Sequence, residues 1–69
     1  MKTIKVIELI GTSKESWEDA ANMAAKEAHE TIKGISGLEL VGQTARFENG
    51  AITEYRSNVK IAFLVDENR

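Results

Sequence analysis

The chain has 69 residues and contains neither cysteine nor proline. This length allows one domain with a small core, which oligomerisation often stabilises, and the lack of cysteine excludes disulfides and thiolate metal sites. Nine Lys and Arg residues against eleven Asp and Glu residues give a net charge of −2 with both signs dispersed, which disfavours nucleic acid or an anionic membrane as a partner. No apolar run suits a signal peptide or a membrane span. We expect one cytoplasmic domain over residues 1–69.

The first expected element is a strand over residues 3–10. Apolar, mostly β-branched residues occupy both its odd- and its even-numbered positions, which point to opposite faces. This pattern predicts a strand that is covered on both faces. Gly11, Thr12 and Ser13 are expected to end the strand and to supply the cap of a helix. The cap is either Thr12, in a capping box with Glu15, or Ser13.

A helix is expected from Lys14 to about Lys33, because apolar residues recur there at i, i+4, i+7 and i+11. Most of these residues are alanines, which let a sheet approach the helix axis closely. Gly34 is the expected C-cap. The apolar stripe consists of Trp17, Ala21, Ala24, Ala28 and either Ile32 or Thr31.

The chain after residue 37 is expected to form a long hairpin around Asn49 and Gly50, since a type I′ turn needs positive φ at both central residues. With these two residues in the turn, Gly42 lies opposite Ser57 and interrupts the packed face. Such a glycine predicts a bulge that shifts the pairing beyond it. The expected pairs are Leu38 with Ile61, Glu39 with Lys60, Leu40 with Val59 and Gln43 with Arg56.

The order of these elements predicts an α+β fold with β-α-β-β connectivity. The helix returns the chain, so the first two strands run in the same direction and the third runs opposite to both. With the third strand in the middle, a three-stranded antiparallel sheet in the order 1-3-2 wraps on one long helix. A single helix covers only one face of that sheet, so the remaining apolar residues predict an obligate oligomer. These residues are Ile7, Leu9, Val41, Ala45, Phe47 and Ile52.

Two separated motifs resemble the dodecin family. Residues 6–13 (VIELIGTS) and 15–20 (ESWEDA) look like its signature, and residues 54–63 (EYRSNVKIAF) are similar to its last strand. The resemblance implies a hollow homododecamer, built from trimers, that stores flavin between two-fold-related subunits. FMN, riboflavin or FAD is the implied cofactor. A tryptophan at the start of the second strand stacks on the flavin, and a glutamine on the third strand hydrogen-bonds it.

This sequence departs from that pattern at both positions. Gly37 stands where the resemblance places the stacking tryptophan, and Arg56 stands where it places the glutamine. The expected register puts Gln43 beside Arg56, on the sheet face away from the helix. The predicted cofactor-binding residues are therefore Gly37, Arg56 and Gln43. An arginine in this pocket favours a phosphate or carboxylate group of the ligand.

The leading functional hypothesis is a dodecin-like dodecamer that binds or stores a small cofactor-type ligand. The alternative is a structural or ion-binding assembly that has lost flavin binding, in which the short acidic tail 66–68 supplies oxygen ligands to a metal ion such as calcium. No catalytic motif is present, so an enzyme is not expected. Trp17 is expected to pack in the core or at a subunit interface, and His29 to lie exposed to solvent.

Overall fold

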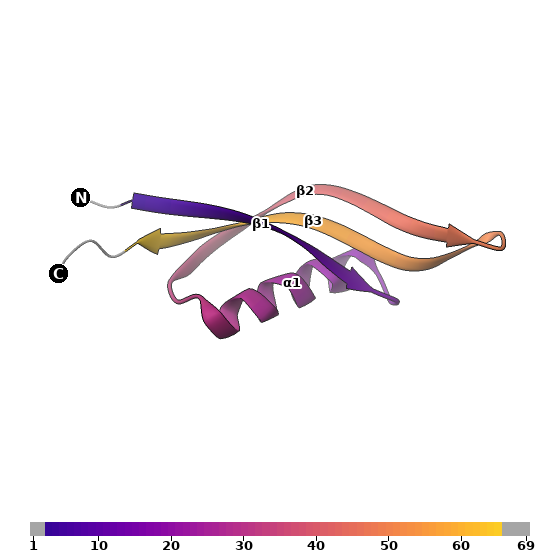
Figure 1. Cartoon of the computed structure of the whole chain (residues 1–69), viewed down its shortest axis with the longest axis horizontal. Coiled ribbons are helices and arrows are strands. Elements are labelled where there is room, and N and C mark those ends of the chain that lie inside the picture. Colours follow the sequence, from indigo (N-terminus) through magenta and orange to yellow (C-terminus); the bar gives the residue numbers. More distant parts are fainter. Residues whose placement is uncertain (1–2, 66–69) are drawn as a thin grey trace.

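The computed structural model describes residues 3–65, in which three strands form one sheet and a single helix packs against one face of it (Figure 1). The sheet is antiparallel with the order β1-β3-β2. This arrangement confirms the predicted α+β fold and its topology. The molecule is 55 Å long and 12 Å across its thinnest dimension, which is the elongated shape expected of strands this long. The elements are β1 (Thr3–Ser13), α1 (Trp17–Thr31), β2 (Ile35–Glu48) and β3 (Ala51–Val65).

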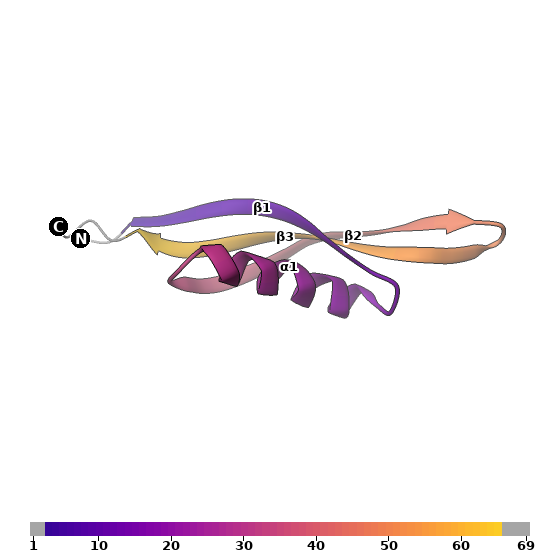
Figure 2. The ribbon, with the colours of Figure 1, turned by 60° about the horizontal axis from the view of Figure 1, so that its bottom comes forward.

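The core lies between α1 and one face of the sheet, and the other face has no cover within the subunit (Figure 2). Val59 and Ile61 on β3 are completely buried against the alanine side of the helix. Ile7 and Leu9 pack against the same cluster, so the prediction that the helix cannot reach these two residues is wrong. Apolar residues lie on both faces of β1, so the sequence alone does not indicate which face the helix covers.

The helix approaches β1 closely at Gly11. A Cβ atom added at Gly11 would lie 2.0 Å from the carbonyl oxygen of Ala20 and 3.0 Å from the Cβ of Ala24. Gly11 therefore does not end the strand as predicted, because β1 continues through it to Ser13. The buried residues of the helix are Ala20, Ala24 and Ala28, and Ala21 and Ile32 pack against the core at its edge. The predicted stripe is therefore confirmed at these positions except Ala20, which it missed.

The helix begins later than predicted. Its N-cap is Ser16, whose side-chain oxygen accepts a hydrogen bond from the backbone N–H of Asp19 at 3.0 Å. Both predicted caps, Thr12 and Ser13, are wrong. Ser13 instead accepts from the backbone N–H of Glu15 at 2.8 Å and donates to the carboxylate of Asp19 at 2.7 Å. This serine therefore closes the turn that leads from β1 into the helix.

The hairpin turn is the predicted one, with φ values of 54° at Asn49 and 79° at Gly50. The predicted pairs hold at residues 38–40 of β2 and again next to the turn. Between these regions the register is shifted by one residue, because β2 has an irregularity after Leu40 and β3 has another opposite Arg46. A shift beyond Gly42 was predicted, and it places Gln43 opposite Ser57 and Arg56 opposite Thr44. The predicted pairing of Gln43 with Arg56 is therefore wrong.

Large apolar side chains remain exposed in the single subunit. On the face away from α1, Ile4, Val6 and Ile10 of β1 are 57%, 51% and 64% exposed. The β2–β3 hairpin extends beyond both the helix and the end of β1 (Figures 1 and 2), and Phe47 near its tip is 67% exposed. Within residues 3–65, no helix is long and apolar enough to cross a membrane.

Candidate functional site

The uncovered face of the sheet is organised in rows that cross all three strands. Because directly paired residues of antiparallel strands share a face, Arg56 of β3 lies between Thr12 of β1 and Thr44 of β2. Gly37 lies on the same face, beside Ala62. We call this surface, which is opposite to the helix, the open face.

Gln43 lies on the other side of the sheet from Arg56. Its partner on β3 is Ser57, a completely buried residue that faces the helix and donates a hydrogen bond to the carbonyl of Trp17 at 2.7 Å. The one-residue shift moves Gln43 from the open face to the helix side. The structure therefore does not bring Gln43 and Arg56 together in one subunit.

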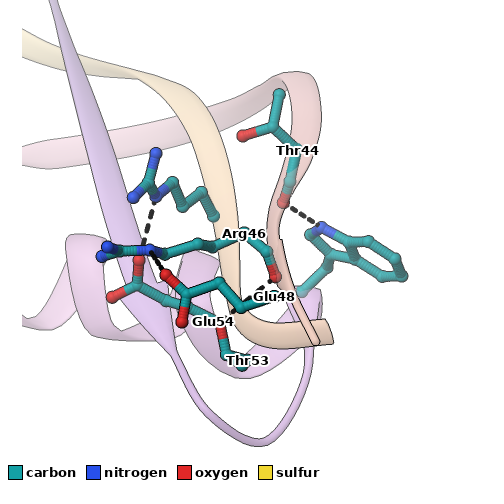
Figure 3. A network of polar contacts seen from close by, with 7 residues as sticks. Thr44, Arg46, Glu48, Thr53 and Glu54 are labelled. Atoms are coloured by element: carbon teal, nitrogen blue, oxygen red, sulfur yellow. Dashed lines mark hydrogen bonds and ion pairs between the residues drawn. The ribbon is translucent and has the colours of Figure 1, made fainter. Parts of the chain in front are cut away.

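We call the part of the β2–β3 hairpin that extends beyond α1 and β1 the hairpin arm. Arg56 belongs to a polar cluster at its base. Its Nε donates to the carboxylate of Glu54 at 3.0 Å, and the Nε of Arg46 donates to the carboxylate of Glu48 at 2.9 Å (Figure 3). Arg46 is directly opposite Glu54 in the β2–β3 ladder, so the two ion pairs are neighbours on the open face. The sequence-based prediction named Arg56 and neither Arg46 nor Glu48, because these two β2 residues share its face only in the shifted register.

The irregularity in β3 is stabilised by Thr53, whose hydroxyl donates to the carbonyl of Arg46 at 3.3 Å (Figure 3). This bond holds the strand segments that carry the two ion pairs next to one another. A hollow of about 300 Å³ lies beside the cluster and is lined by Lys14, Arg46, Glu48, Thr53 and Glu54.

Trp17 fixes the position of the arm relative to the helix. Its indole N–H donates to the backbone carbonyl of Thr44 at 2.7 Å, as the dashed line to the labelled Thr44 shows in Figure 3. Its ring meets the ring of Tyr55 edge to face, with 4.7 Å between the centroids. These contacts direct Trp17 toward the helix side of the sheet, where it packs against Tyr55 outside the buried core cluster.

The central rows of the open face combine charge with an unsatisfied polar atom. Glu8, Lys60 and Glu39 form one row across the three strands, which confirms the predicted pairing of Glu39 with Lys60. In the next row, the side-chain oxygen of Asn58 is buried and accepts no hydrogen bond within the part of the chain that the structure describes. Its neighbour Gly42 leaves open space on this face.

A family model for dodecins matches residues 3–66 of the sequence. The chain belongs to the dodecin family. This membership confirms the family indicated by the two sequence motifs, and the matched range includes every strand and the helix of the fold.

Individual dodecins are similar to this chain over nearly its whole length. The calcium dodecin of Mycobacterium tuberculosis is 32% identical over 63 residues, which cover 91% of this chain and 89% of the relative. Its crystal structure, described as that of a calcium-chelating antigen with a novel calcium-binding site, matches with a TM-score of 0.82 and 31% identity over 97% and 96% of the two chains. A dodecin from Streptomyces davaonensis matches with a TM-score of 0.90 and 26% identity, over 96% and 97%.

In this dodecin, the two expected pocket positions are far apart within one subunit. Gly37 pairs with Ala62, which is six residues from Arg56 along β3, a separation of about 20 Å at the rise of a β-strand. No atom lies within 4 Å of a Cβ built on Gly37, so this position is open in the subunit. The described chain therefore does not bring Gly37 and Arg56 together in one small pocket.

Metal ligands are not grouped in the described part of this dodecin. Residues 3–65 contain no set of three or more His, Asp or Glu side chains placed to hold one ion. The acidic tail 66–68, to which the sequence hypothesis assigned calcium, lies outside the described residues. His29 is exposed on the helix, as expected.

Proposed function

We propose that the chain assembles into a hollow shell of twelve copies, built from trimers, that binds and stores a small cofactor-type ligand in the cytoplasm. The observation that carries this proposal is the open face. Its large apolar side chains Ile4, Val6 and Ile10 are each more than half exposed in the subunit, and exposed apolar surface of this kind is typical of a protein interface. Membership of the dodecin family supports closure of that surface by further copies.

The ligand pockets lie between copies in this proposal. Two features support it: Gly37 and Arg56 are about 20 Å apart along the strands of one subunit, and the space above Gly37 is open. A second copy supplies the missing wall of each pocket. FMN, riboflavin or FAD is the proposed ligand, held without the aromatic face that a tryptophan would provide at Gly37. We propose a binding protein and no catalytic step.

Flavin binding is tested by titrating FMN, riboflavin and FAD with the purified protein and following flavin fluorescence. Quenching with a fixed stoichiometry per chain is the expected result, because flavin fluorescence falls when the ring is enclosed by protein. Native mass spectrometry of the same sample reports whether twelve chains are present. A dodecamer that quenches none of the flavins at micromolar concentrations would contradict the flavin ligand and leave the shell intact.

A second candidate function is calcium binding, which one specific observation favours. A relative that is 32% identical to this chain is a calcium dodecin. Since residues 3–65 of one chain contain no group of three or more potential metal ligands, the proposed ion site combines acidic residues of several copies, among them Asp66 and Glu67. Calorimetric titration with calcium, compared between the natural chain and a variant with Asp66→Asn and Glu67→Gln, tests this function. Equal calcium affinity of the two proteins would remove the tail from the site.

A further inference from the structure

The tip of the hairpin arm carries two large apolar side chains that α1 does not cover. Phe47 follows Arg46, which lies on the open face, so the alternation of side chains along a strand points Phe47 to the helix side of the sheet. Ile52 is paired with Phe47 and shares this side. The helix does not extend over the arm (Figures 1 and 2), and Phe47 and Ile52 are 67% and 42% exposed. We call these two residues the tip pair.

A hollow of about 200 Å³ lies along the seam between β1 and α1. Its lining side chains are mainly apolar, and they include Leu9, Ile10, Met23 and Ala24. The charged side chain of the lining is Glu27, which forms no ion pair within residues 3–65. A cavity of roughly 150 Å³ with an apolar lining holds a benzene molecule, so this hollow has room for one phenyl ring. We call it the seam hollow.

The strand beside the seam hollow is an edge strand. β1 is bonded to β3 on one side only, so at residues 9–12 its outer edge has no strand partner within the described chain. Backbone N–H and C=O groups at such an edge are a contact for another polypeptide, whereas a small apolar molecule cannot bond to them. The seam hollow therefore favours a polypeptide segment that brings an aromatic side chain.

The tip pair of the same copy cannot fill the seam hollow. Thr12 of the hollow is paired with Arg56, which is four residues from Ile52 along β3, or about 13 Å at the rise of a β-strand. Phe47 lies on β2, one strand further from β1. Trp17 holds the arm in this position through its hydrogen bond to the backbone of β2.

We infer that the tip pair of one copy docks in the seam hollow of a neighbouring copy, with the Phe47 ring inserted between β1 and α1. The occupant is a second copy because the chain itself supplies the matching apolar side chains, and because the side-chain amide of Asn49 at the tip brings N–H donors for Glu27. This contact uses the helix side of the sheet and the outer edge of β1, so it is separate from the open face. The inference deepens the proposed function, on which it rests, by naming the contact that joins the copies of each trimer.

Pairs of introduced cysteines test this contact directly, because the natural chain contains no cysteine. A variant with Phe47→Cys and Met23→Cys is oxidised with copper phenanthroline in its assembled form and run on a denaturing gel without reductant. We expect covalently linked dimers and trimers, because the two thiols meet between copies.

The matched control combines Phe47→Cys with Glu30→Cys. Glu30 is exposed on the helix and lies seven residues beyond Met23 on the same flank, about 10 Å away. A disulfide forms only when the Cβ atoms approach within about 4.5 Å, so the control should give about tenfold fewer links. Equal yields from the two cysteine pairs, or no link in either, would overturn the inference.

A second measurement needs no cysteine. Phe47→Ala changes a largely exposed side chain and should leave the circular dichroism spectrum of the subunit unchanged. Because a buried aromatic anchor contributes a large share of the energy of an interface, the assembly should dissociate at a lower urea concentration in gel filtration. Dissociation at the same urea concentration as the natural protein would contradict the inference.

The size of the linked species separates this inference from the proposed function. Selective links through Met23 that stop at two chains retain the contact and contradict the trimer. Selective links in a protein that never reaches twelve copies retain the contact and contradict the shell. Sedimentation of the natural protein as twelve chains, combined with equal yields from the two cysteine pairs, retains the shell and overturns the contact.

Discussion

Replacing Gly11 with alanine tests whether the close contact between α1 and β1 determines the packing of the subunit. The new Cβ would lie 2.0 Å from the carbonyl oxygen of Ala20, whereas non-bonded carbon contacts are comfortable at roughly 3.5 Å or more. The carbonyl belongs to the helix backbone and cannot rotate away as a side chain would. The helix must therefore move by at least about 1 Å from β1, which loosens the core at Val59 and Ile61.

Overpacking of this kind typically costs about 1–3 kcal/mol, and alanine returns about 0.4–1 kcal/mol by restricting the unfolded chain. We expect Gly11→Ala to lower the free energy of unfolding by about 2 kcal/mol. That is a large fraction of the few kcal/mol available to a chain of this length. Urea unfolding followed by circular dichroism, at one fixed protein concentration, measures the difference between the midpoints.

Gly42→Ala is the matched control, because no atom lies within 4 Å of a Cβ built there. Its midpoint should stay within the equivalent of about 0.5 kcal/mol of the natural protein. If Gly11→Ala unfolds at the same urea concentration as the natural protein and Gly42→Ala, the close approach of the helix to β1 is refuted.

Three further changes test other parts of the structure. Ser57→Ala removes the buried hydrogen bond to the Trp17 carbonyl and should lower the free energy of unfolding by about 1 kcal/mol, measured by thermal unfolding. Gly37→Trp adds an aromatic face in open space and should raise flavin affinity about tenfold in fluorescence titrations; an unchanged affinity would show that stacking at this position does not limit binding. Val6→Asp puts a charge on the open face and should weaken assembly by about 1–3 kcal/mol per contact, seen as smaller species in gel filtration, while the helical circular dichroism signal is retained.

Much of the fold could be predicted because local signals agreed with one another. Asn49 and Gly50 determined the turn, and the turn determined the register next to it and the pairing of β3 with β2. The helix and its alanine stripe followed from periodicity. The faces of β1 could not be predicted, because apolar residues occupy both of them and only packing against α1 identifies Ile7 and Leu9 as the covered pair.

The candidate site was harder to predict than the fold, because it depends on a one-residue shift. Gly42 indicated a bulge, but a glycine does not say how many residues the shift will cover. The structure shows that the shifted register extends from Gly42 to Arg46, and that Thr53 bonds across the second irregularity. Within this segment every β2 side chain changes face, which removes Gln43 from the predicted pocket and brings Arg46 onto the face of Arg56 and Glu54.

Family resemblance predicted binding positions at Gly37 and Arg56 without stating how they lie relative to each other in one chain. Gly37 and Arg56 share the open face as expected, yet the length of strand between them exceeds the reach of a small ligand. In the proposed shell the contacts between copies complete each pocket, and neither the sequence pattern nor the fold of one chain contains them.

The central claim is that the open face is buried between copies of the chain. Sedimentation velocity over a dilution series to nanomolar protein, on chains of 7.6 kDa, measures this most directly. A single species with the mass of twelve chains that persists through the series is the result expected of a closed shell. A folded single subunit that sediments alone at the lowest concentrations, with its circular dichroism spectrum unchanged, would contradict the claim.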